Sequence, residues 1–372
     1  MLKNKRILIV GPPLEEPGGV SGYYQSILPF LTRQGGADTT ILYLGLGARS
    51  GIVFKFKILS LLVDVFSFLF KLVINRPHLI HVNPSLLPKS LVRDSFVILI
   101  SRLFSKTRVV VFFRGWNVNN ERFVENWFWF FKRTLLNADQ YISLSRHSVK
   151  IIISWGVSND RLNLACTVID PGLEGFLKAL NSPGFIQHKA LSDKIRILFL
   201  GRLVREKGLY ELLEGFSVAY KRNRNLELVI AGNGTEFGNI RSLVRKNGLE
   251  HAVKFLGQVS GAEKYNALVS SHLFLLPSYT EGMPNSVLEA MASGCIVFGT
   301  PVGALVEFIE NDLIKPLKAR DSRSIAVALS DATIFQRNLE HCIATSDYAR
   351  KAFSQDSVCA SLLDVYAKTL NP

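Results

Sequence analysis

The chain has few cysteines, and they are scattered. Four occur in 372 residues, without a C-x-x-C motif: Cys166, Cys295, Cys342 and Cys359. This spacing argues against a zinc site and against a disulfide framework. A reducing compartment fits the sequence best, and we expect the protein to be cytoplasmic.

Long uncharged apolar runs are also missing. The N-terminal MLKNKRILIVGPP has basic residues before an apolar run, but that run is short and ends in Gly-Pro-Pro. We interpret it as a first β-strand rather than a signal peptide. The longest apolar stretch, residues 52–74, contains Lys55, Lys57, Asp64 and Lys71, which argues against a membrane-spanning helix.

Residues 52–74 instead have the pattern of an amphipathic helix. Polar residues recur at steps of three and four and leave a wide apolar face: Lys57, Ser60, Asp64, Ser67, Lys71 and Asn75. Such a helix suits a membrane interface, with its lysines toward anionic headgroups, or a core position with one solvated edge. A second apolar cluster, FVENWFWFFKRTLL from Phe123, has helical spacing that favours the core.

Acidic residues are scarce in the N-terminal half. Residues 1–180 hold 22 Lys and Arg against 11 Asp and Glu, whereas residues 181–372 hold 22 against 19, within a net charge of +14 for the chain. A basic half suits nucleic acid, anionic lipid or a phosphorylated substrate. No nucleic-acid-reading motif is evident, so we expect no nucleic acid and instead an anionic membrane surface, bound peripherally at the inner face of the cell membrane through residues 52–74.

Strand-like apolar runs alternate with helical stretches along the chain, which predicts an α/β fold of βαβ units around parallel sheets. The expected strands are Arg6–Val10, Thr40–Leu44, Leu79–Val82, Arg108–Phe113, Gln140–Leu144, Ile195–Leu200, Leu226–Ala231, Val253–Leu256, Leu273–Leu276 and Ile296–Gly299. Residues 171–194 interrupt this series with proline and glycine, so we expect domains over 1–180 and 190–353. Two doubly wound domains of this kind bind ligands at the carboxyl ends of their strands, facing each other across a cleft.

Three loops after expected strands are rich in glycine or cations. The first strand runs into GPPLEEPGGVSGYY, where a helix N-terminus near Val20 favours an anion. The segment GRLVREKG places Arg202 and Lys207 on one loop, a pair suited to a diphosphate. In VIAGNG, Gly232 and Gly234 let the backbone approach a ligand closely. Taken singly, these loops are equally compatible with ordinary turns and solvated cations.

Two glutamates eight positions apart flank a predicted helix start in EGMPNSVLEAMASG. Glu281 follows a strand, Gly282 to Asn285 supply backbone donors, and Glu289 lies about one turn into the helix. Because phosphates bind at such a helix end, the two carboxylates can accept hydrogen bonds from hydroxyls on either side of a diphosphate. A nucleotide sugar has this constitution. Either glutamate alone is also compatible with an ordinary surface acid.

These segments resemble the retaining glycosyltransferases of family four, which have the GT-B fold of two Rossmann-like domains. The resemblance covers nearly the whole chain through PGGVSGYY, GRLVREKG, VIAGNG, PSYTEGMPNSVLEAMASGCIVFGTPVGALVEFI and AFSQDSVCASLLDVYAKTL. It implies sugar transfer from a nucleoside diphosphate to an acceptor hydroxyl with anomeric retention, with no cofactor and no essential metal. It also implies that the last helix, in residues 354–372, crosses back to the first domain.

The resemblance assigns roles to individual residues. Arg202 and Lys207 would hold the pyrophosphate and compensate leaving-group charge, and Glu289 would bind the ribose hydroxyls. Glu281 resembles the glutamate set against the donor sugar. The remaining donor-site residues implied by the resemblance are Gly282, Met283, Pro284 and Asn285 of the loop, and Gly18 and Gly19 of the N-terminal domain.

One segment departs from the family pattern. Many members have a histidine near the donor sugar, after a strand of the N-terminal domain, where this chain reads VVVFFRGWNVN. Arg114 stands there and either contacts a phosphate or an acidic acceptor or is an ordinary loop cation. His81, at another strand end, is an alternative contact, although a lone strand-end histidine is more often structural.

The acceptor is not specified by any motif. The basic half and the amphipathic stretch favour a lipid-linked or other glycan acceptor, in polysaccharide, lipopolysaccharide or glycolipid synthesis. A nucleotide-sugar 2-epimerase and a non-catalytic scaffold with the same architecture are the alternatives. The complete motif set favours transfer over both.

Overall fold

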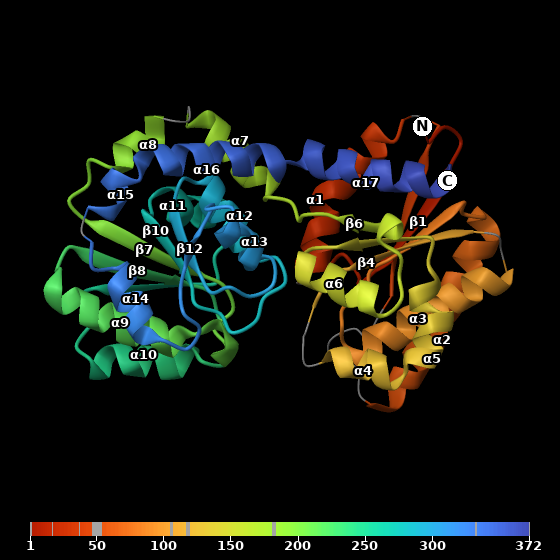
Figure 1. The fold of residues 1–372 in the computed structure, drawn as a ribbon, viewed down its shortest axis with the longest axis horizontal. Helices are drawn as coiled ribbons and strands as arrows, with labels where there is room; N and C mark the ends of the chain where they lie inside the picture. Colours follow the sequence, from red (N-terminus) through yellow and green to blue (C-terminus); the bar gives the residue numbers. More distant parts are fainter. Residues whose placement is uncertain are drawn as a thin grey trace. The chain divides into compact units, whose positions relative to one another are not determined.

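The computed structural model describes residues 2–16, 18–36, 38–46, 54–104, 107–116, 120–180, 184–331 and 333–371, with backbone alone for residues 54–62. The chain divides into two compact units (Figure 1). Unit 1 comprises residues 1–168 and 355–372, and unit 2 comprises residues 169–354.

Unit 1 is built on a six-stranded parallel sheet in the order β2-β1-β3-β4-β5-β6. Its strands are β1 (Arg6–Gly11), β2 (Thr40–Gly45), β3 (Leu79–Val82), β4 (Arg108–Phe113), β5 (Gln140–Ser143) and β6 (Leu162–Leu164). The central strands are continuous runs of buried apolar residues, as expected where helices cover both faces of a parallel sheet. Because β1 connects to β2 on one side while β3 leads to β4 on the other, the strand order reverses between β1 and β3.

Helices pack around this sheet (Figure 1). They are α1 (Gly19–Gln34), α2 (Phe54–Asn75), α3 (Pro88–Phe104), α4 (Glu121–Asn126), α5 (Phe128–Arg133), α6 (Arg146–Ser154) and α17 (Gln355–Leu370), with short 3-10 turns at Leu135–Asn137 and Asn159–Arg161. Helix α17 packs on α1 and β4, so the last helix of the chain belongs to unit 1.

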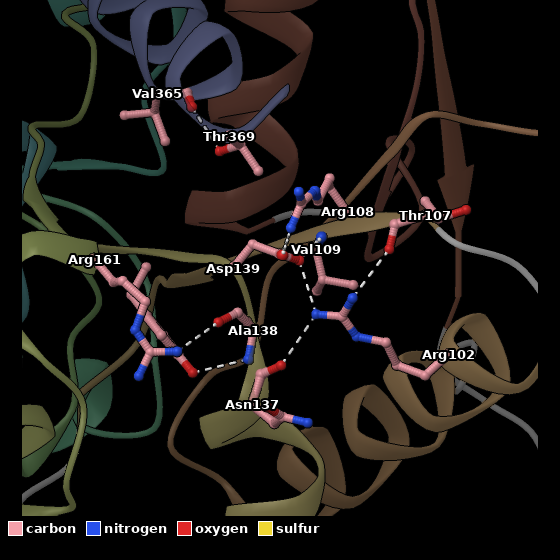
Figure 2. A network of polar contacts seen from close by, with 11 residues as sticks. Arg102, Thr107, Arg108, Val109, Asn137, Ala138, Asp139, Arg161, Val365 and Thr369 are labelled. Carbon is pink, nitrogen blue, oxygen red and sulfur yellow. Dashed lines mark hydrogen bonds and ion pairs between the residues drawn. The ribbon is translucent and has the colours of Figure 1, made fainter. Parts of the chain in front are cut away.

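Asp139 fixes the amino-terminal edge of this sheet (Figure 2). Its carboxylate accepts hydrogen bonds from Arg102 Nη2 (2.8 Å), Arg108 Nη1 (2.8 Å) and the Val109 backbone N–H (2.7 Å). One side chain therefore ties α3 and β4 to the start of β5. This end of the sheet is opposite to the carboxyl ends of the strands, so Asp139 has a structural role.

We expect Asp139→Ala to lower the free energy of unfolding by about 2 to 3 kcal/mol, because it removes two charge-assisted hydrogen bonds and leaves the Val109 N–H without its acceptor. Urea denaturation measures the loss. The matched control is Asp364→Ala, which removes an exposed ion pair with Lys368 on α17 and should change stability by less than about 0.5 kcal/mol. Equal losses in the two variants would show that the Asp139 network contributes no more than a surface pair.

Unit 2 has a second six-stranded parallel sheet, in the order β12-β11-β10-β7-β8-β9. Its strands are β7 (Ile195–Leu200), β8 (Leu226–Ala231), β9 (Val253–Gly257), β10 (Leu273–Leu276), β11 (Ile296–Gly299) and β12 (Lys315–Pro316). The helices are α7 (Pro171–Ala179), α8 (Gly184–Lys189), α9 (Leu209–Arg222), α10 (Phe237–Lys246), α11 (Gly261–Val269), α12 (Asn285–Ala292), α13 (Leu305–Glu310), α14 (Ser322–Ala328), α15 (Ile334–Arg337) and α16 (Leu339–Ala352), with a 3-10 turn at Arg205–Lys207.

The ten expected strands are confirmed to within one residue at each end, and so is the α/β architecture with two parallel sheets. The short edge strands β6 and β12 were not expected, since LNL and KP carry no apolar run. The division of the chain also differs from the expected boundary within 171–194, which holds α7 and α8 of unit 2. Pro171 there starts a helix at its first position, where proline is favoured, and Asp170 caps it.

Helix α2 presents an apolar face to solvent. Phe68 and Leu72 are buried in the core of unit 1, whereas five large side chains are exposed: Val63, Phe66, Phe70, Val73 and Ile74. Asp64, Ser67, Lys71 and Asn75 of the expected polar stripe are half-buried, while the side chains of Lys57 and Ser60 lie outside the described residues. The expectation of a core helix with a solvated polar edge therefore holds only in part for residues 63–75, because the helix contributes Phe68 and Leu72 to the core but also exposes large apolar side chains. Among the described residues, no helix combines the length and the apolar character that crossing a membrane requires.

The second apolar cluster is only partly in the core. Phe131 is fully buried, but Trp127 and Trp129 are 59% and 71% exposed. The helix is interrupted at Trp127, between α4 and α5, and the two tryptophans face solvent there.

Candidate active site

The carboxyl end of the unit 2 sheet has a topological switch point between β7 and β10. These strands are neighbours, but β7 continues to β8 on one side and β10 to β11 on the other. In open α/β sheets, the loops at such a point diverge and leave a crevice for ligands. The loop after β7 carries Arg202 and Lys207, and the loop after β10 carries Glu281.

The loop after β7 is held against the loop after β10 by Gly208. This residue has φ = 70°, in the left-handed region, and a Cβ there would overlap the Pro277 carbonyl oxygen. The Tyr279 backbone N–H donates to the Glu206 carbonyl oxygen (2.8 Å), which adds a second link. The two loops therefore form one rigid platform.

Lys207 and Glu281 meet on this platform. The Lys207 ammonium forms an ion pair with Glu281 Oε1, and both side chains are mostly buried. Arg202 on the same loop is exposed. The structure thus brings together one anion and one cation at the switch point and leaves a second cation facing solvent.

The glycines after β8 serve the packing of unit 2 itself. A Cβ on Gly232 would overlap the Gly201 carbonyl oxygen, and one on Gly234 would overlap the Leu203 carbonyl oxygen. Leu203 N–H donates to the Asn233 carbonyl oxygen (2.9 Å). The close approach that the sequence predicted for these glycines is therefore made by the loop after β7, which they position.

The loop before α12 is pinned by the segment after β11. Ala304 N–H donates to the Gly282 carbonyl oxygen (2.8 Å), and Gly303, with φ = 57°, leaves no room for a Cβ beside the Glu281 carbonyl oxygen. Helix α12 begins at Asn285, and no side chain caps its N-terminus. Gly282, Met283, Pro284 and Asn285 are half-buried there.

Glu289 lies one turn into α12 and is only 5% exposed. Its Oε1 accepts from Lys264 Nζ (3.0 Å), and the same ammonium donates to Asp170 Oδ2 (2.7 Å). Asp170 Oδ1 in turn accepts from the Gly172 N–H (2.9 Å) and the Tyr265 hydroxyl (3.1 Å). Burial raises the pKa of Glu289, although Lys264 opposes the shift. Glu289 is therefore held by a cation that two carboxylates share.

Gly18 and Gly19 stand at the start of α1, after β1 of unit 1. Gly18 has an extended backbone (φ = 177°), and a Cβ on either residue would meet nothing closer than Ser21 Oγ at 4.0 Å. Among the described residues, neither conformation nor packing requires glycine at these two positions. A requirement for glycine would therefore come from outside the protein's own packing.

His81 is fully buried and bonded on both sides of its ring. Nδ1 lies 2.6 Å from the Tyr366 hydroxyl and Nε2 lies 3.3 Å from the Tyr24 hydroxyl, which also donates to Asn83 (2.7 Å). Burial lowers its pKa to about 3, so the imidazole is neutral at physiological pH. This environment favours the structural interpretation of His81, which joins β3 to α1 and α17.

Arg114 follows β4 and is 9% exposed. Its guanidinium carbon lies 3.8 Å from the ring centroid of Tyr23 and 4.7 Å from that of Phe112. It is thus a buried cation held between aromatic faces and not an ordinary loop cation.

Residues 185–340 match the family model described as "Glycosyl transferases group 1". The matched range contains the whole platform after β7 and β10 together with α12. This segment of unit 2 is a member of the glycosyl transferase group 1 family.

Three relatives are similar to this chain over part of its length. An uncharacterized glycosyltransferase, MJ1607, of Methanocaldococcus jannaschii is 36% identical over 32% of this chain and 31% of its own. The phosphatidylinositol N-acetylglucosaminyltransferase GPI3 subunit of Saccharomyces cerevisiae is 24% identical over 48% and 39%, and the amylovoran biosynthesis glycosyltransferase AmsK of Erwinia amylovora is 26% identical over 55% and 49%. The matched stretches thus span less than half the length of each relative.

Solved structures resemble the chain over nearly its whole length. The Anabaena protein Alr3699/HepE, in complex with UDP-glucose, aligns with a TM-score of 0.71 at 15% identity, over 98% of this chain and 99% of that one. Sucrose-phosphate synthase from Thermosynechococcus elongatus aligns with a TM-score of 0.74 at 19% identity, over 98% of both chains. The two doubly wound units therefore make a GT-B fold. That they face each other across a cleft stays a prediction.

Sequence analysis missed three residues of this candidate site: Asp170, Lys264 and Gly303. Asp170 and Lys264 lie far apart in the sequence and on no motif, so their pairing with Glu289 gives no signal there. Gly303 lies in GTPVGA, where a glycine after Pro301 and Val302 is a signal for a tight turn. Among the described residues, no group of three or more His, Cys, Asp or Glu side chains is arranged to hold a metal ion.

Proposed function

We propose that this protein transfers a sugar from a nucleoside-diphosphate sugar to an acceptor hydroxyl with retention of anomeric configuration. The observation that supports it most is the pairing of Lys207 with Glu281 at the switch point of unit 2, beside the uncapped N-terminus of α12. A diphosphate at this place would meet a movable ammonium, the exposed Arg202 and free backbone N–H groups.

The donor would lie along the loop before α12. Glu289 would accept hydrogen bonds from the ribose hydroxyls, and Glu281 would lie against the donor sugar. The amides of Gly282, Met283 and Asn285 and the ring of Pro284 would line the path between them. On unit 1, Gly18 and Gly19 would let the substrates approach the backbone, which agrees with the open space around both. A UDP-sugar is the first donor to test, because HepE was solved with UDP-glucose.

The chemistry would need charge stabilisation more than a nucleophile. As the bond from the anomeric carbon to the diphosphate breaks, negative charge grows on the leaving oxygen, and Arg202 and Lys207 are the groups able to stabilise it. The acceptor oxygen bonds to the same face of the anomeric carbon, and its proton passes to the leaving diphosphate. We therefore propose a metal-independent, front-face substitution, with Arg202, Lys207 and Glu281 as the catalytic residues.

Binding of a panel of nucleotide sugars, measured by calorimetry with wild type beside Glu289→Ala, tests this function. One nucleotide should bind, and the variant should bind it more weakly. NMR of the sugar after incubation with donor alone separates transfer from 2-epimerisation, since only an epimerase inverts the configuration at C2 of the donor sugar, whereas a transferase without an acceptor can only hydrolyse the donor. No binding of any nucleotide sugar would favour the scaffold instead.

We also propose that unit 1 lies against an anionic membrane and that the acceptor is lipid-linked. Helix α2 contacts α3 (Figure 1). Phe96 of α3 has its ring centroid 6.3 Å from that of Phe130 of α5. The exposed apolar side chains on these neighbouring helices are Phe66 and Phe70 of α2, Phe96, Leu99 and Leu103 of α3, and Trp129 of α5. Lys132 and Arg133 beside them are exposed cations for headgroup phosphates.

We expect the double substitution Phe66→Glu and Phe70→Glu to weaken binding to phosphatidylserine-containing liposomes at least about tenfold, since it removes two large apolar anchors and adds repulsion. Liposome flotation measures the bound fraction. Val327→Glu is the matched control, because Val327 is equally exposed but lies in unit 2. Flotation of the double variant at the wild-type level would exclude α2 as the anchor.

A further inference from the structure

Arg114 is a buried cation, and no acidic side chain in the part of the chain that the structure describes forms an ion pair with it. Its Nε and Nη1 are buried, and among the described residues neither has a hydrogen-bond acceptor. The titratable groups that interact with it are His81, which is neutral, and Tyr23, Tyr24, Tyr43 and Cys166. Burial raises the pKa of the three tyrosines and of Cys166, the last to about 11, so all four are neutral at physiological pH.

An unpaired buried guanidinium is costly. Arginine does not lose its proton in proteins, and a buried charge without partner or hydrogen bonds destabilises the folded chain. The rings of Tyr23 and Phe112 compensate only part of this through cation–π contacts. A buried charge that lowers the stability of the fold is typical of a binding site, where a ligand supplies the missing partner.

The position of Arg114 in unit 1 supports the same conclusion. It follows the carboxyl end of β4, and its backbone N–H donates to the Pro84 carbonyl oxygen (3.0 Å), which ties it to the loop after β3. β3 borders the point where the strand order reverses in this sheet, and Tyr23 comes from α1, whose N-terminus follows Gly18 and Gly19. Ligands of doubly wound sheets bind at this edge.

We propose that Arg114 binds an anionic oxygen group, a carboxylate or a phosphate, on the substrate part held by unit 1. The planar fork of a guanidinium matches two oxygens of either group, and the aromatic faces fix its orientation. A neutral sugar would leave the charge unpaired. The assignment of the anion to a sugar substrate rests on the proposed function. Anion binding by Arg114 does not, because it can be measured without turnover.

The test measures the binding of three small molecules to one variant of the protein. Arg202→Gln with Lys207→Gln removes the two cations proposed to bind the donor diphosphate, and calorimetry on this variant then measures binding of glucuronate, inorganic phosphate and neutral glucose. We expect one or both anions to bind and glucose not to bind. Adding Arg114→Met, which keeps an unbranched chain in place of the aliphatic part of arginine and removes the charge, should weaken anion binding by about 10- to 100-fold, and Arg114→Lys should retain part of it.

Unfolding of the same variants separates a binding role from a structural one. Without ligand, Arg114→Met should be as stable as its parent or more stable, because it removes an unpaired buried charge. A marked loss of stability, no anion binding in the parent, or equal binding in Arg114→Met would each overturn the proposal. Glucuronate without phosphate identifies a carboxylate ligand, and phosphate without glucuronate identifies a phosphorylated one.

The nucleotide-sugar panel keeps the two proposals separate. If nucleotides bind in a Glu289-dependent manner but anions bind without Arg114, only this inference fails. If anions need Arg114 but no nucleotide binds, the proposed function fails and the anion site stands.

Discussion

Lys207→Ala should lower kcat/KM by about 30- to 1,000-fold, equivalent to about 2 to 4 kcal/mol of transition-state stabilisation. Lys207 is the cation held at the switch point, and its charge is most valuable when the diphosphate leaves. Because the interaction is made mainly in the transition state, kcat should carry most of the loss while the donor Kd changes less. Steady-state transfer measures it, or donor hydrolysis where no acceptor is present.

A matched control removes a neighbouring cation. Arg205 begins the same 3-10 turn but stacks on Tyr210, with its guanidinium carbon 4.2 Å from the ring centroid. Arg205→Ala should change kcat/KM by less than about threefold, since it removes only an exposed cation–π contact. Normal turnover in Lys207→Ala would count against the whole platform as the reaction site.

A second comparison asks whether Lys207 acts directly or through Glu281. If the lysine only orients the glutamate, Glu281→Gln should cost as much as Lys207→Ala, and the double variant should cost no more than either one. If Lys207 stabilises the leaving group, the double variant should lose activity beyond both single variants. This cycle measures the coupling across the ion pair.

The sheets could be predicted from the sequence because parallel strands buried on both faces are continuous apolar runs, as in Leu273–Leu276. The loops that carry Lys207 and Glu281 followed from the same argument, since each loop comes after a predicted strand. The exposure of Trp127 and Trp129 was not predicted, because it depends on tertiary packing. Both belong to an apolar cluster with helical spacing, yet both are exposed, and the helix is interrupted at Trp127 between α4 and α5.

The glycines show a different limit. Gly232 and Gly234 were interpreted as residues that let the backbone approach a ligand closely, and in the structure each lies against a carbonyl oxygen of residues 201–203. Sequence alone cannot name the group that makes a close approach. Gly18 and Gly19 have open space beside them among the described residues, and their contact with a ligand stays a prediction.

Lys264, the ion-pair partner of Glu289, could not be identified from the sequence either. Its substitution gives the second of the two largest expected effects. Lys264→Met should lower the free energy of unfolding by about 3 to 5 kcal/mol near neutral pH, because it leaves the buried Glu289 carboxylate without its cation. Asp170 loses the same ion pair but keeps its bonds to Gly172 and Tyr265. Urea denaturation measures the loss.

The pH dependence of this variant identifies the cause. Burial already raises the pKa of Glu289, and loss of Lys264 removes the main opposing influence, so the pKa rises further. A carboxyl whose folded pKa lies above its unfolded value binds its proton more tightly when folded, so its ionisation destabilises the fold as pH rises from the unfolded to the folded pKa. Lys264→Met should thus be closest to wild type at pH values below the ordinary pKa of a glutamate carboxyl and lose stability as the pH rises above it. Adding Glu289→Gln removes the ionisable group and should restore most of the stability and flatten the profile. A profile for Lys264→Met parallel to that of wild type would show that Glu289 is not the group left unpaired.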